Sequence, residues 1–196
     1  PTPPLVVHGR PTLARREPRT EPSATDSLAE PRGRTTTDLP AGRLSTGVTR
    51  VCLVGDADLD VRYELLSRET ARAALSTYDL AEPFENSLAV DVVSLGAAVA
   101  LLNDLDWYLV RFVDLALVRE PSVSRTEWLT RALATAIRDG EVEPAESSGH
   151  VAVYGVEDGR LVEPLYAVRT PGGDRPEYDL RDVDDTVVVR VTPDEF

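Results

Sequence analysis

Three aspartates at alternating positions follow the first apolar segment of the chain. This stretch reads GVTRVCLVGDADLD over residues 47–60, and it ends in Gly55, Asp56, Asp58 and Asp60. Asp56 and Asp58 could hold Mg²⁺, because phosphoryl-transfer sites commonly bind this cation through one or two carboxylates. A competing interpretation makes Asp58 the N-cap of a following helix, with the neighbouring carboxylates placed favourably beside the positive helix end.

A second acidic cluster lies near the end of the chain, in the stretch YDLRDVDD. Its members Asp182, Asp184 and Asp185 immediately precede a strand-like run, TVVVRV. Asp182 and Asp185 could complete a divalent metal site with the first cluster, provided that the first and last strands are neighbours. In a chain this rich in acidic residues, such clusters also arise as ordinary solvated surface.

Nucleotide chemistry that depends on glycine or lysine is not indicated. The turn after the first apolar run supplies Gly55 alone, where a dinucleotide-binding loop needs three glycines. The chain contains no lysine, so it has no complete Walker A loop and no amine for a Schiff base. We therefore expect no cofactor, apart from Mg²⁺ under the metal hypothesis.

Histidine and cysteine are too few for most other sites. After residue 47 the chain has one histidine, His150, and one cysteine, Cys52. A structural zinc site needs four such ligands, and a serine triad would need His150 beside a G-x-S-x-G turn that is missing. We expect His150 to be an exposed or sheet-edge imidazole and Cys52 to be an inert thiol inside an apolar strand.

Asp91 and Arg111 are charged residues inside apolar, strand-like runs. On one face of a sheet they could form a partly buried ion pair or line a pocket. The alternative is that both face solvent from a half-exposed sheet.

The charge of the chain is unevenly distributed. Residues 1–47 carry seven arginines and five acidic residues, whereas residues 48–196 carry fourteen arginines and twenty-nine acidic residues, a net charge of −15. A globule of this size and charge stores on the order of 25 kcal/mol of unscreened self-repulsion, compared with a typical stability of about 5 to 15 kcal/mol. We therefore expect a halophilic protein that needs concentrated salt to fold.

Composition also divides the chain into two parts. Residues 1–47 hold eight of the fifteen prolines and no aromatic residue, which predicts a disordered tail. Because the chain has no methionine, an alternative is that the native protein starts at Val48 and that the preceding residues are translated upstream sequence. Residues 48–196 are expected to form a single acidic domain. With no signal peptide and no long apolar run, we expect a cytoplasmic protein that does not enter a membrane.

Periodicity predicts the secondary structure of this domain. Strands are expected over residues 49–55, 88–94, 106–113 and 186–191, and a hairpin over 150–169 turns at Asp158 and Gly159. Helices are expected over residues 58–77 (as one or two), from a Ser94 cap to about Leu102, and from a Ser124–Glu127 capping box to Gly140. The order predicts an α/β or α+β fold with a mixed sheet of about six strands, three helices and a C-terminal antiparallel hairpin.

Three stretches carry a resemblance to a known family: TRVCLVGDADLDVRYELLSRETAR, WYLVRFVD and DLRDVDDTVVVRV. From about residue 48 to the end, the chain resembles a small haloarchaeal family of uncharacterised proteins, a domain of unknown function. The resemblance implies a cytoplasmic protein of salt-loving archaea and brings no activity, ligand or catalytic residue.

Two functions follow from the sequence. The first is a non-enzymatic binding or interaction module that contacts an unknown protein partner or forms a homodimer through apolar edge strands. The alternative is a metal-dependent phosphoesterase or nucleotide-handling enzyme built on the aspartate clusters. Nucleic-acid binding is not expected, because the domain is strongly negative.

Overall fold

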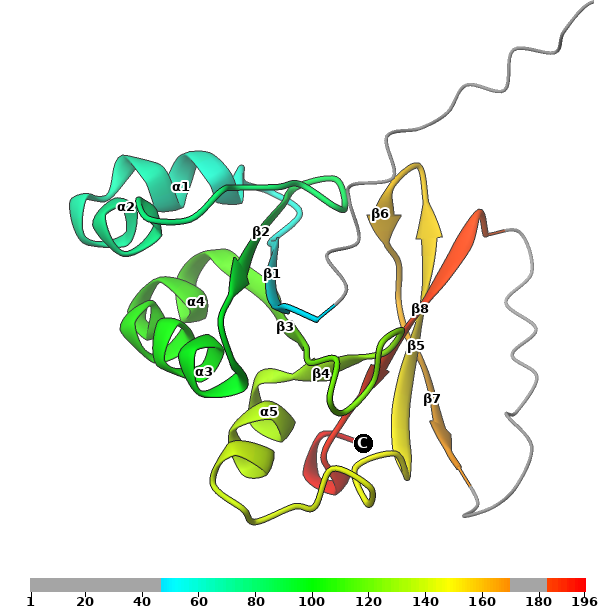
Figure 1. Ribbon diagram of the computed structural model, residues 1–196. Coiled ribbons are helices and arrows are strands. Elements are labelled where there is room, and N and C mark those ends of the chain that lie inside the picture. The colour runs from blue at the N-terminus through cyan, green and yellow to red at the C-terminus, as the bar shows by residue number, and fades with distance from the viewer. Residues whose placement is uncertain (1–46, 170–182) are drawn as a thin grey trace, which may run out of the picture. The chain divides into compact units, whose positions relative to one another are not determined.

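The computed structural model describes residues 47–169 and 183–196, which form an α+β domain with a mixed sheet (Figure 1). These residues form one compact unit. The predicted disordered tail, residues 1–47, lies outside the described residues except for Gly47. The elements in chain order are β1 (Thr49–Gly55), α1 (Val61–Ser67), α2 (Glu69–Leu75), β2 (Ser87–Val92), α3 (Leu95–Asp104), α4 (Asp106–Phe112), β3 (Val113–Arg119), β4 (Trp128–Thr130), α5 (Arg131–Arg138), β5 (His150–Glu157), β6 (Arg160–Leu161), β7 (Leu165–Val168), β8 (Asp185–Arg190) and a 3₁₀ turn, Pro193–Glu195. The fold class is as predicted, but the described residues form eight strands and five α-helices, more than the sequence indicated.

The eight strands of the described residues belong to one sheet. Their order is β2-β1-β3-β4-β8-β5-β6, and β7 also pairs with β5. The pairing is antiparallel except between β4 and β8, which run parallel, so the sheet is mixed as expected. The predicted C-terminal hairpin is antiparallel and turns at Asp158 and Gly159, which both have positive φ.

Strand β1, which lies between β2 and β3, contributes side chains to two cores. Val51 and Leu53 pack with the helices in the larger core, whereas Cys52 packs in a smaller core with residues of β5 and β8, including Ala152 and Val189. Because successive side chains of a strand point to opposite faces, an uninterrupted apolar run is what a strand buried on both faces requires. In Figure 1 the helices lie on one side of β2, β1 and β3, and strands β5 to β8 lie on the other.

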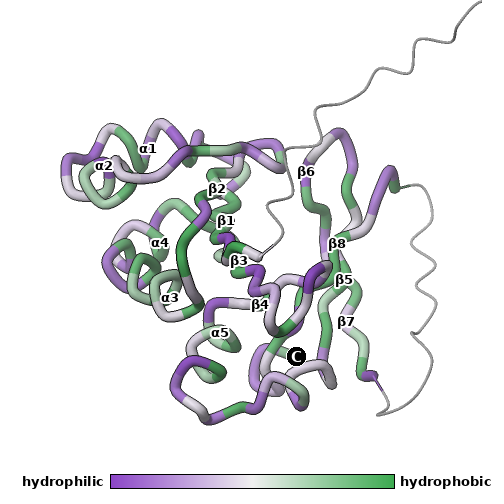
Figure 2. The backbone as a smooth tube through the Cα atoms, in the orientation of Figure 1, coloured by the Kyte–Doolittle hydropathy of each residue, from purple (hydrophilic) through white to green (hydrophobic). Residues whose placement is uncertain are grey.

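Hydropathy follows this arrangement. Figure 2 shows mainly hydrophobic residues along the strands. Along the helices, hydrophobic and hydrophilic residues alternate. Cys52 is fully buried, and burial raises the pKa of its thiol to about 12. A thiol held neutral in an apolar core is a poor nucleophile, which agrees with the packing role expected for Cys52.

The strand predicted over residues 106–113 is wrong, because residues 106–112 form helix α4. Leu105 and Leu109 are both buried in the larger core and lie four residues apart on one helix face, while Trp107 and Val110 are exposed. The dense aromatic and β-branched residues gave a strand signal, but contacts of the leucines with the core favour the helix. The following strand, β3, begins only at Val113.

The helix predicted from the Ser124–Glu127 capping box begins later than expected. Ser124 Oγ does accept a hydrogen bond from the Glu127 amide, at 3.1 Å, but residues 128–130 continue as strand β4. Helix α5 begins at Arg131 and is capped by Thr130, whose side chain accepts from the Leu133 amide. The Ser124–Glu127 hydrogen bond therefore shapes a turn before a strand and does not begin a helix. Residues 128–130 form the strand because Trp128 and Leu129 are buried in the two cores and pair with neighbouring strands.

Candidate functional site: a two-lobed cleft beside the end of β1

The loop after β1 is shaped by hydrogen bonds between its own acidic side chains and backbone amides. Asp56 Oδ1 accepts from the Asp58 amide at 3.0 Å, and Asp60 Oδ1 accepts from the Tyr63 amide at 2.9 Å. Asp60, with extended backbone angles, is thus the N-cap of α1. The assignment of this role to Asp58 was wrong, because the helix begins at Val61, two residues later than that cap would require.

Asn86, the residue just before β2, holds this loop in place. Its Nδ2 donates to the carbonyl oxygens of Asp56 and Leu59, each at 2.8 Å, and its Oδ1 accepts from the Val61 amide at 2.9 Å. The residue itself has φ 53°, the left-handed conformation that asparagine tolerates better than most residues. One side chain therefore fixes three points of the loop between β1 and α1.

Gly55 makes room for this arrangement. A Cβ atom added to it would lie 2.6 Å from Val61 Cβ and 2.7 Å from Asn86 Nδ2. The glycine that ends β1 is thus required for the close approach of Asn86 and the first turn of α1. Glycines inside strands often mark such a close approach.

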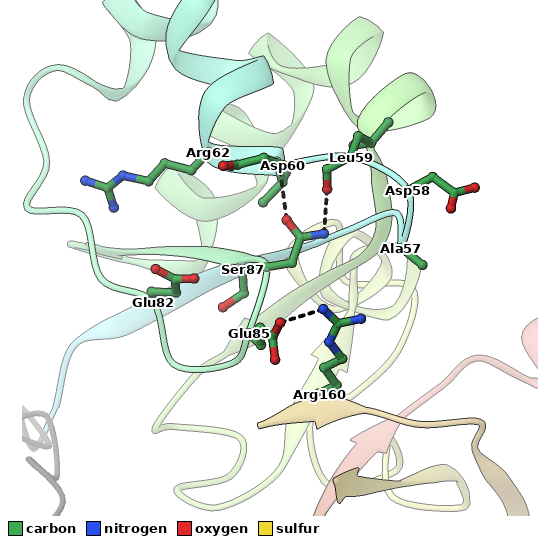
Figure 3. A pocket seen from close by; sticks show the side chains of 11 residues that line it. Ala57, Asp58, Leu59, Asp60, Arg62, Glu82, Glu85, Ser87 and Arg160 are labelled. Carbon is green, nitrogen blue, oxygen red and sulfur yellow. Dashed lines mark hydrogen bonds and ion pairs between the residues drawn. The ribbon is translucent and has the colours of Figure 1, made fainter. Parts of the chain in front are cut away.

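The β5–β6 hairpin reaches the segment just before β2, next to Asn86, from the far end of the sheet. The Glu85 amide donates to the Gly159 carbonyl at 2.8 Å, and Arg160 forms an ion pair with the Glu85 carboxylate (Figure 3). This ion pair lowers the pKa of Glu85 below its ordinary value, chiefly through the hydrogen bond from Arg160. The sheet is therefore curled, and β6 meets the loop before β2 although the two strands are at opposite ends of the strand order.

Two depressions lie on either side of this contact and form what we call the cleft. The first has a volume of about 430 Å³ and the second about 300 Å³. Four residues line both lobes: Ala57, Glu85, Asn86 and Arg160. In Figure 3 Arg62 and Asp58 extend away from each other on opposite sides of the first lobe, while Arg160 extends from β6 toward Glu85.

The first lobe is the more polar of the two. Besides the four shared residues, its lining residues are Asp58, Leu59, Asp60, Val61, Arg62, Glu82 and Ser87. Ser87 is buried, and its hydroxyl is engaged with the Phe84 backbone. The polar groups of this lobe are mostly charged. Two of them, Asp60 and Asn86, already form hydrogen bonds with the backbone of the loop between β1 and α1 or with the first turn of α1.

The second lobe combines apolar and acidic groups. Its further lining residues are Val54, Gly55, Asp114, Leu115, Tyr154, Leu161, Val162, Glu163 and Pro164. Tyr154 is half-buried, and burial raises the pKa of its phenol to about 12, so the hydroxyl is neutral at physiological pH. The carboxylates of Asp114 and Glu163 are exposed, and we call them the rim of this lobe; its further aliphatic and aromatic lining residues are partly buried, and we call them the floor.

A β-bulge brings Asp114 to this lobe. Val54 pairs with Leu115 but Gly55 pairs with Val113, so Asp114 is an extra residue in β3 without a partner in the register of β1. Bulges redirect a side chain and interrupt pairing, and they occur often beside active sites. Asp114 is exposed and lines the second lobe as a result.

The four aspartates predicted as metal ligands do not form one group among the described residues. Asp58 lines the first lobe, Asp56 is exposed in the loop beside it, and Asp182 lies outside the described residues. Asp185 begins β8, which is separated from β1 in the sheet by β3 and β4, so the first and last strands are not neighbours. Among residues 47–169 and 183–196, no three histidine, cysteine or acidic side chains gather closely enough to hold a metal ion.

Asp91 and Arg111, the two charged residues noted inside apolar runs, lie on different elements and have different partners. Asp91 accepts two hydrogen bonds from Arg50 across the β1–β2 pair, at 2.6 and 2.8 Å, and these bonds lower the pKa of its carboxyl. Arg111 lies on α4, with its guanidinium 4.3 Å from the centre of the Trp107 ring. His150 is partly buried and contacts the Phe196 ring edge-on at 5.2 Å.

Several residues of the cleft were not identified from the sequence, namely Glu85, Asn86, Asp114, Tyr154 and Arg160. Asp114 is the one that left a signal, since it is a lone acidic residue in the apolar run FVDLALV. The others come together only because the sheet curls, which no local pattern encodes.

Comparisons with known proteins give a family but no function. A family model described as a family of unknown function (DUF5804) matches residues 49–156, more than half of the chain. No curated protein and no solved structure gives a significant match.

Proposed function

The chain belongs to the DUF5804 family, whose function is unknown, and we propose that it is a non-enzymatic module that binds a small molecule in the cleft. The observation that carries this proposal is the pair of adjoining depressions, of about 430 and 300 Å³, in the size range of small-molecule sites, about 300 to 1,000 Å³. The cleft combines an apolar floor with a few polar groups, as ligand sites usually do.

Two ionisable groups of the cleft, Glu85 and Tyr154, are better suited to binding than to acid–base catalysis. The pKa of Glu85 is lowered and that of Tyr154 is raised, so each moves away from neutrality. A general acid or base works best when its pKa lies near the working pH. These two groups are instead suited to remaining in one protonation state while they position a ligand.

A fragment screen followed by two-dimensional ¹H–¹⁵N NMR tests the proposal. Ligands of the cleft should shift the amide signals of Gly55, Asn86 and Arg160 together, because these residues border the second lobe. Signals of Ala134 and Leu133 in α5, within the larger core, serve as internal controls and should not move. A screen in which hits avoid the cleft would contradict the proposal.

Self-association through β7 is a second candidate function, favoured by exposed apolar residues on that strand. β7 pairs with β5 along one edge, and Leu165, Tyr166 and Val168 are 46%, 46% and 58% exposed. Tyr166 and Val168 direct their backbone groups away from β5, so antiparallel pairing of β7 with a second copy would be centred on Ala167 and would place Tyr166 opposite Val168 of that copy. Apolar groups would then face apolar groups on both sides of the two-fold axis.

Analytical ultracentrifugation tests this dimer. The wild-type chain should sediment as a concentration-dependent dimer, and Val168→Pro should give a monomer because proline removes a backbone donor from the free edge of β7 and disfavours strand pairing there. Tyr63→Ala, on an exposed position of α1, is the matched control. A monomeric wild type at high protein concentration would contradict self-association.

The cellular setting that we propose is the cytoplasm of a salt-loving archaeon. It is supported by the net charge of −15 over residues 48–196 and by the replacement of all lysine by arginine. No helix among the described residues has the length and apolarity needed to cross a membrane. The acidic surface does not favour nucleic-acid binding. The alternative function, a metal-dependent phosphoesterase or nucleotide-handling enzyme, stays a prediction that Asp58 variants can test.

A further inference from the structure

We infer that the ligand of the cleft is an organic cation with an aliphatic body, of the alkylguanidinium or alkylammonium class. The inference rests on the proposed function, since it names the chemical class that the same cleft would take. It follows from the aromatic and aliphatic floor, the acidic rim and the contact that Arg160 already makes.

The floor of the second lobe can bury a hydrocarbon chain. Val54, Leu115, Leu161, Val162 and Pro164 line it, and all five are partly buried. Burying each methylene of a ligand there contributes favourably through the hydrophobic effect. An inorganic cation has no apolar surface to bury and would gain nothing from this floor.

Tyr154 adds an aromatic group to the same lobe. A cation placed over a tyrosine ring is attracted by the negative face of its π system, and the attraction increases when the site is partly desolvated. The phenol of Tyr154 stays neutral, so its contribution to cation binding would come from the ring and not from a phenolate charge.

The rim of the cleft is negatively charged. Six carboxylates line the two lobes, from Asp58, Asp60, Glu82, Glu85, Asp114 and Glu163, against two guanidinium groups, from Arg62 and Arg160. Anionic ligands such as phosphates would be repelled. The carboxylates are distributed around the lobes rather than gathered at one point, and among the described residues no three acidic groups meet at metal-binding distance. This spread suits an extended organic cation better than a metal ion.

Arg160 shows that the cleft accommodates a guanidinium group. Its Nη2 donates to Glu85 Oε1 at the ridge between the lobes, and both side chains are about half exposed. A ligand cation would enter the second lobe beside this pair, near Asp114 and Glu163, or would displace Arg160 from Glu85. Removal of the Arg160 charge should therefore strengthen the binding of a cation and weaken the binding of an anion.

The test is a calorimetric and NMR titration of the full chain, in concentrated KCl, with three probes of similar shape. The probes are n-butylguanidinium, its neutral isostere n-butylurea, and pentanoate as an anion. We expect n-butylguanidinium to bind at least tenfold more tightly than either of the others, with amide shifts at Gly55, Asn86 and Arg160.

Variants then separate the contributions. Tyr154→Leu should weaken binding of n-butylguanidinium about fivefold through the lost ring, while Tyr154→Phe should retain most of the affinity. Asp114→Asn should weaken it about threefold, and Asp194→Asn, outside the cleft, should leave it unchanged. Arg160→Gln should strengthen it about threefold.

The outcomes distinguish this inference from the proposed function. Binding of n-butylurea or pentanoate in the cleft as tight as that of n-butylguanidinium would overturn the cation class and leave the binding site intact. Weaker binding of the cation to Arg160→Gln would also overturn it. A titration in which none of the three probes, and no fragment of the screen, shifts the cleft signals would overturn the proposed function and this inference together.

Discussion

Nε of Arg190 lies 2.6 Å from Oε2 of Glu127, and both side chains are nearly buried. Arg169 approaches the other carboxylate oxygen, Oε1, at 2.9 Å, and Arg190 Nη1 also donates to the Ser147 hydroxyl at 2.9 Å. One carboxylate thus binds two guanidinium groups, next to the start of β4 and the end of β8. The arrangement ties the turn before β4 to the ends of β7 and β8.

Replacing Glu127 by Gln should strongly destabilise the fold. The change leaves two arginines in a nearly dry site without their carboxylate, and breaking a buried ion pair in this way costs about 3 to 5 kcal/mol. Urea unfolding at fixed KCl concentration measures the change. Glu141→Gln, at an exposed position, should stay within about 0.5 kcal/mol of wild type. Equal stability of the two variants would contradict a structural role for Glu127.

The same carboxylate should make stability depend on pH in the acid range. Burial raises the pKa of Glu127, but the hydrogen bonds from Arg169 and Arg190 outweigh it, and the pKa lies below its ordinary value. A lowered folded-state pKa adds stability that is complete above the unfolded pKa, about 4.3 for glutamate, and is lost as the pH falls through the folded value. Calorimetry from pH 7 to pH 3 should show a steeper fall in Tm for wild type than for Glu127→Gln. Parallel curves would count against this assignment.

The contact between Gly55 and Asn86 predicts an intolerant position at the cleft. Gly55→Ala should cost about 1 to 3 kcal/mol, because the new Cβ would overlap Val61 and Asn86. Gly149→Ala is the matched control, since its Cβ would meet nothing within 4 Å. Chemical denaturation of both variants measures the difference, and a neutral Gly55→Ala would mean that the loop can shift without cost.

Asn86 variants separate backbone conformation from hydrogen bonding. Asn86→Gly keeps the positive φ accessible but removes three hydrogen bonds, whereas Asn86→Ala loses both. We expect both to be destabilised in urea unfolding, with Ala lower than Gly by about 1 kcal/mol. The reverse order would show that the left-handed conformation is not costly here.

The sequence predicted the elements whose signals are local. Ser94 caps α3 as expected, with its Oγ accepting from the Ala97 amide, and the Asp158–Gly159 turn forms as its residue types require. Both depend on contacts within a few residues. The apolar run of β1 is also a signal contained in a few consecutive residues, and the strand is buried on both faces as that run predicts.

The errors lie where distant contacts decide the outcome. Glu127 was assigned to a capping box, but it is drawn into the buried cluster with Arg190, sixty-three residues later. Residues 106–112 were assigned to a strand, but Leu105 and Leu109 bury one helix face against the core. The cleft was missed for the same reason, because Glu85 and Arg160 meet only when the sheet curls.

Salt concentration should control the stability of the whole domain. The Debye length is about 10 Å at 0.1 M salt and about 3 Å at 1 M, so repulsion among the excess carboxylates is largely screened only in concentrated salt. Tm should therefore rise steeply between 0.1 M and 3 M KCl. A triple variant, Glu141→Gln, Glu143→Gln and Glu146→Gln, should depend less on salt because it carries less excess charge. An unchanged wild-type Tm across this range would contradict the proposed halophilic setting.

Divalent cations should not stabilise the protein through Asp58. Asp58 is exposed, its backbone amide is engaged by Asp56, and Asp185 starts a strand that is separated from β1 by two other strands. If Mg²⁺ or Mn²⁺ bound the folded state with 5 mM present at 100 times its Kd, it would stabilise that state by about 2.7 kcal/mol, a shift that is readily visible in a melting curve. We expect instead the same Tm for wild type and for Asp58→Ala, with 5 mM of either cation or with KCl of equal ionic strength. A cation-dependent rise in wild type that is lost in Asp58→Ala would establish the metal site, and a hydrolase assay against phosphoesters would then be the next measurement.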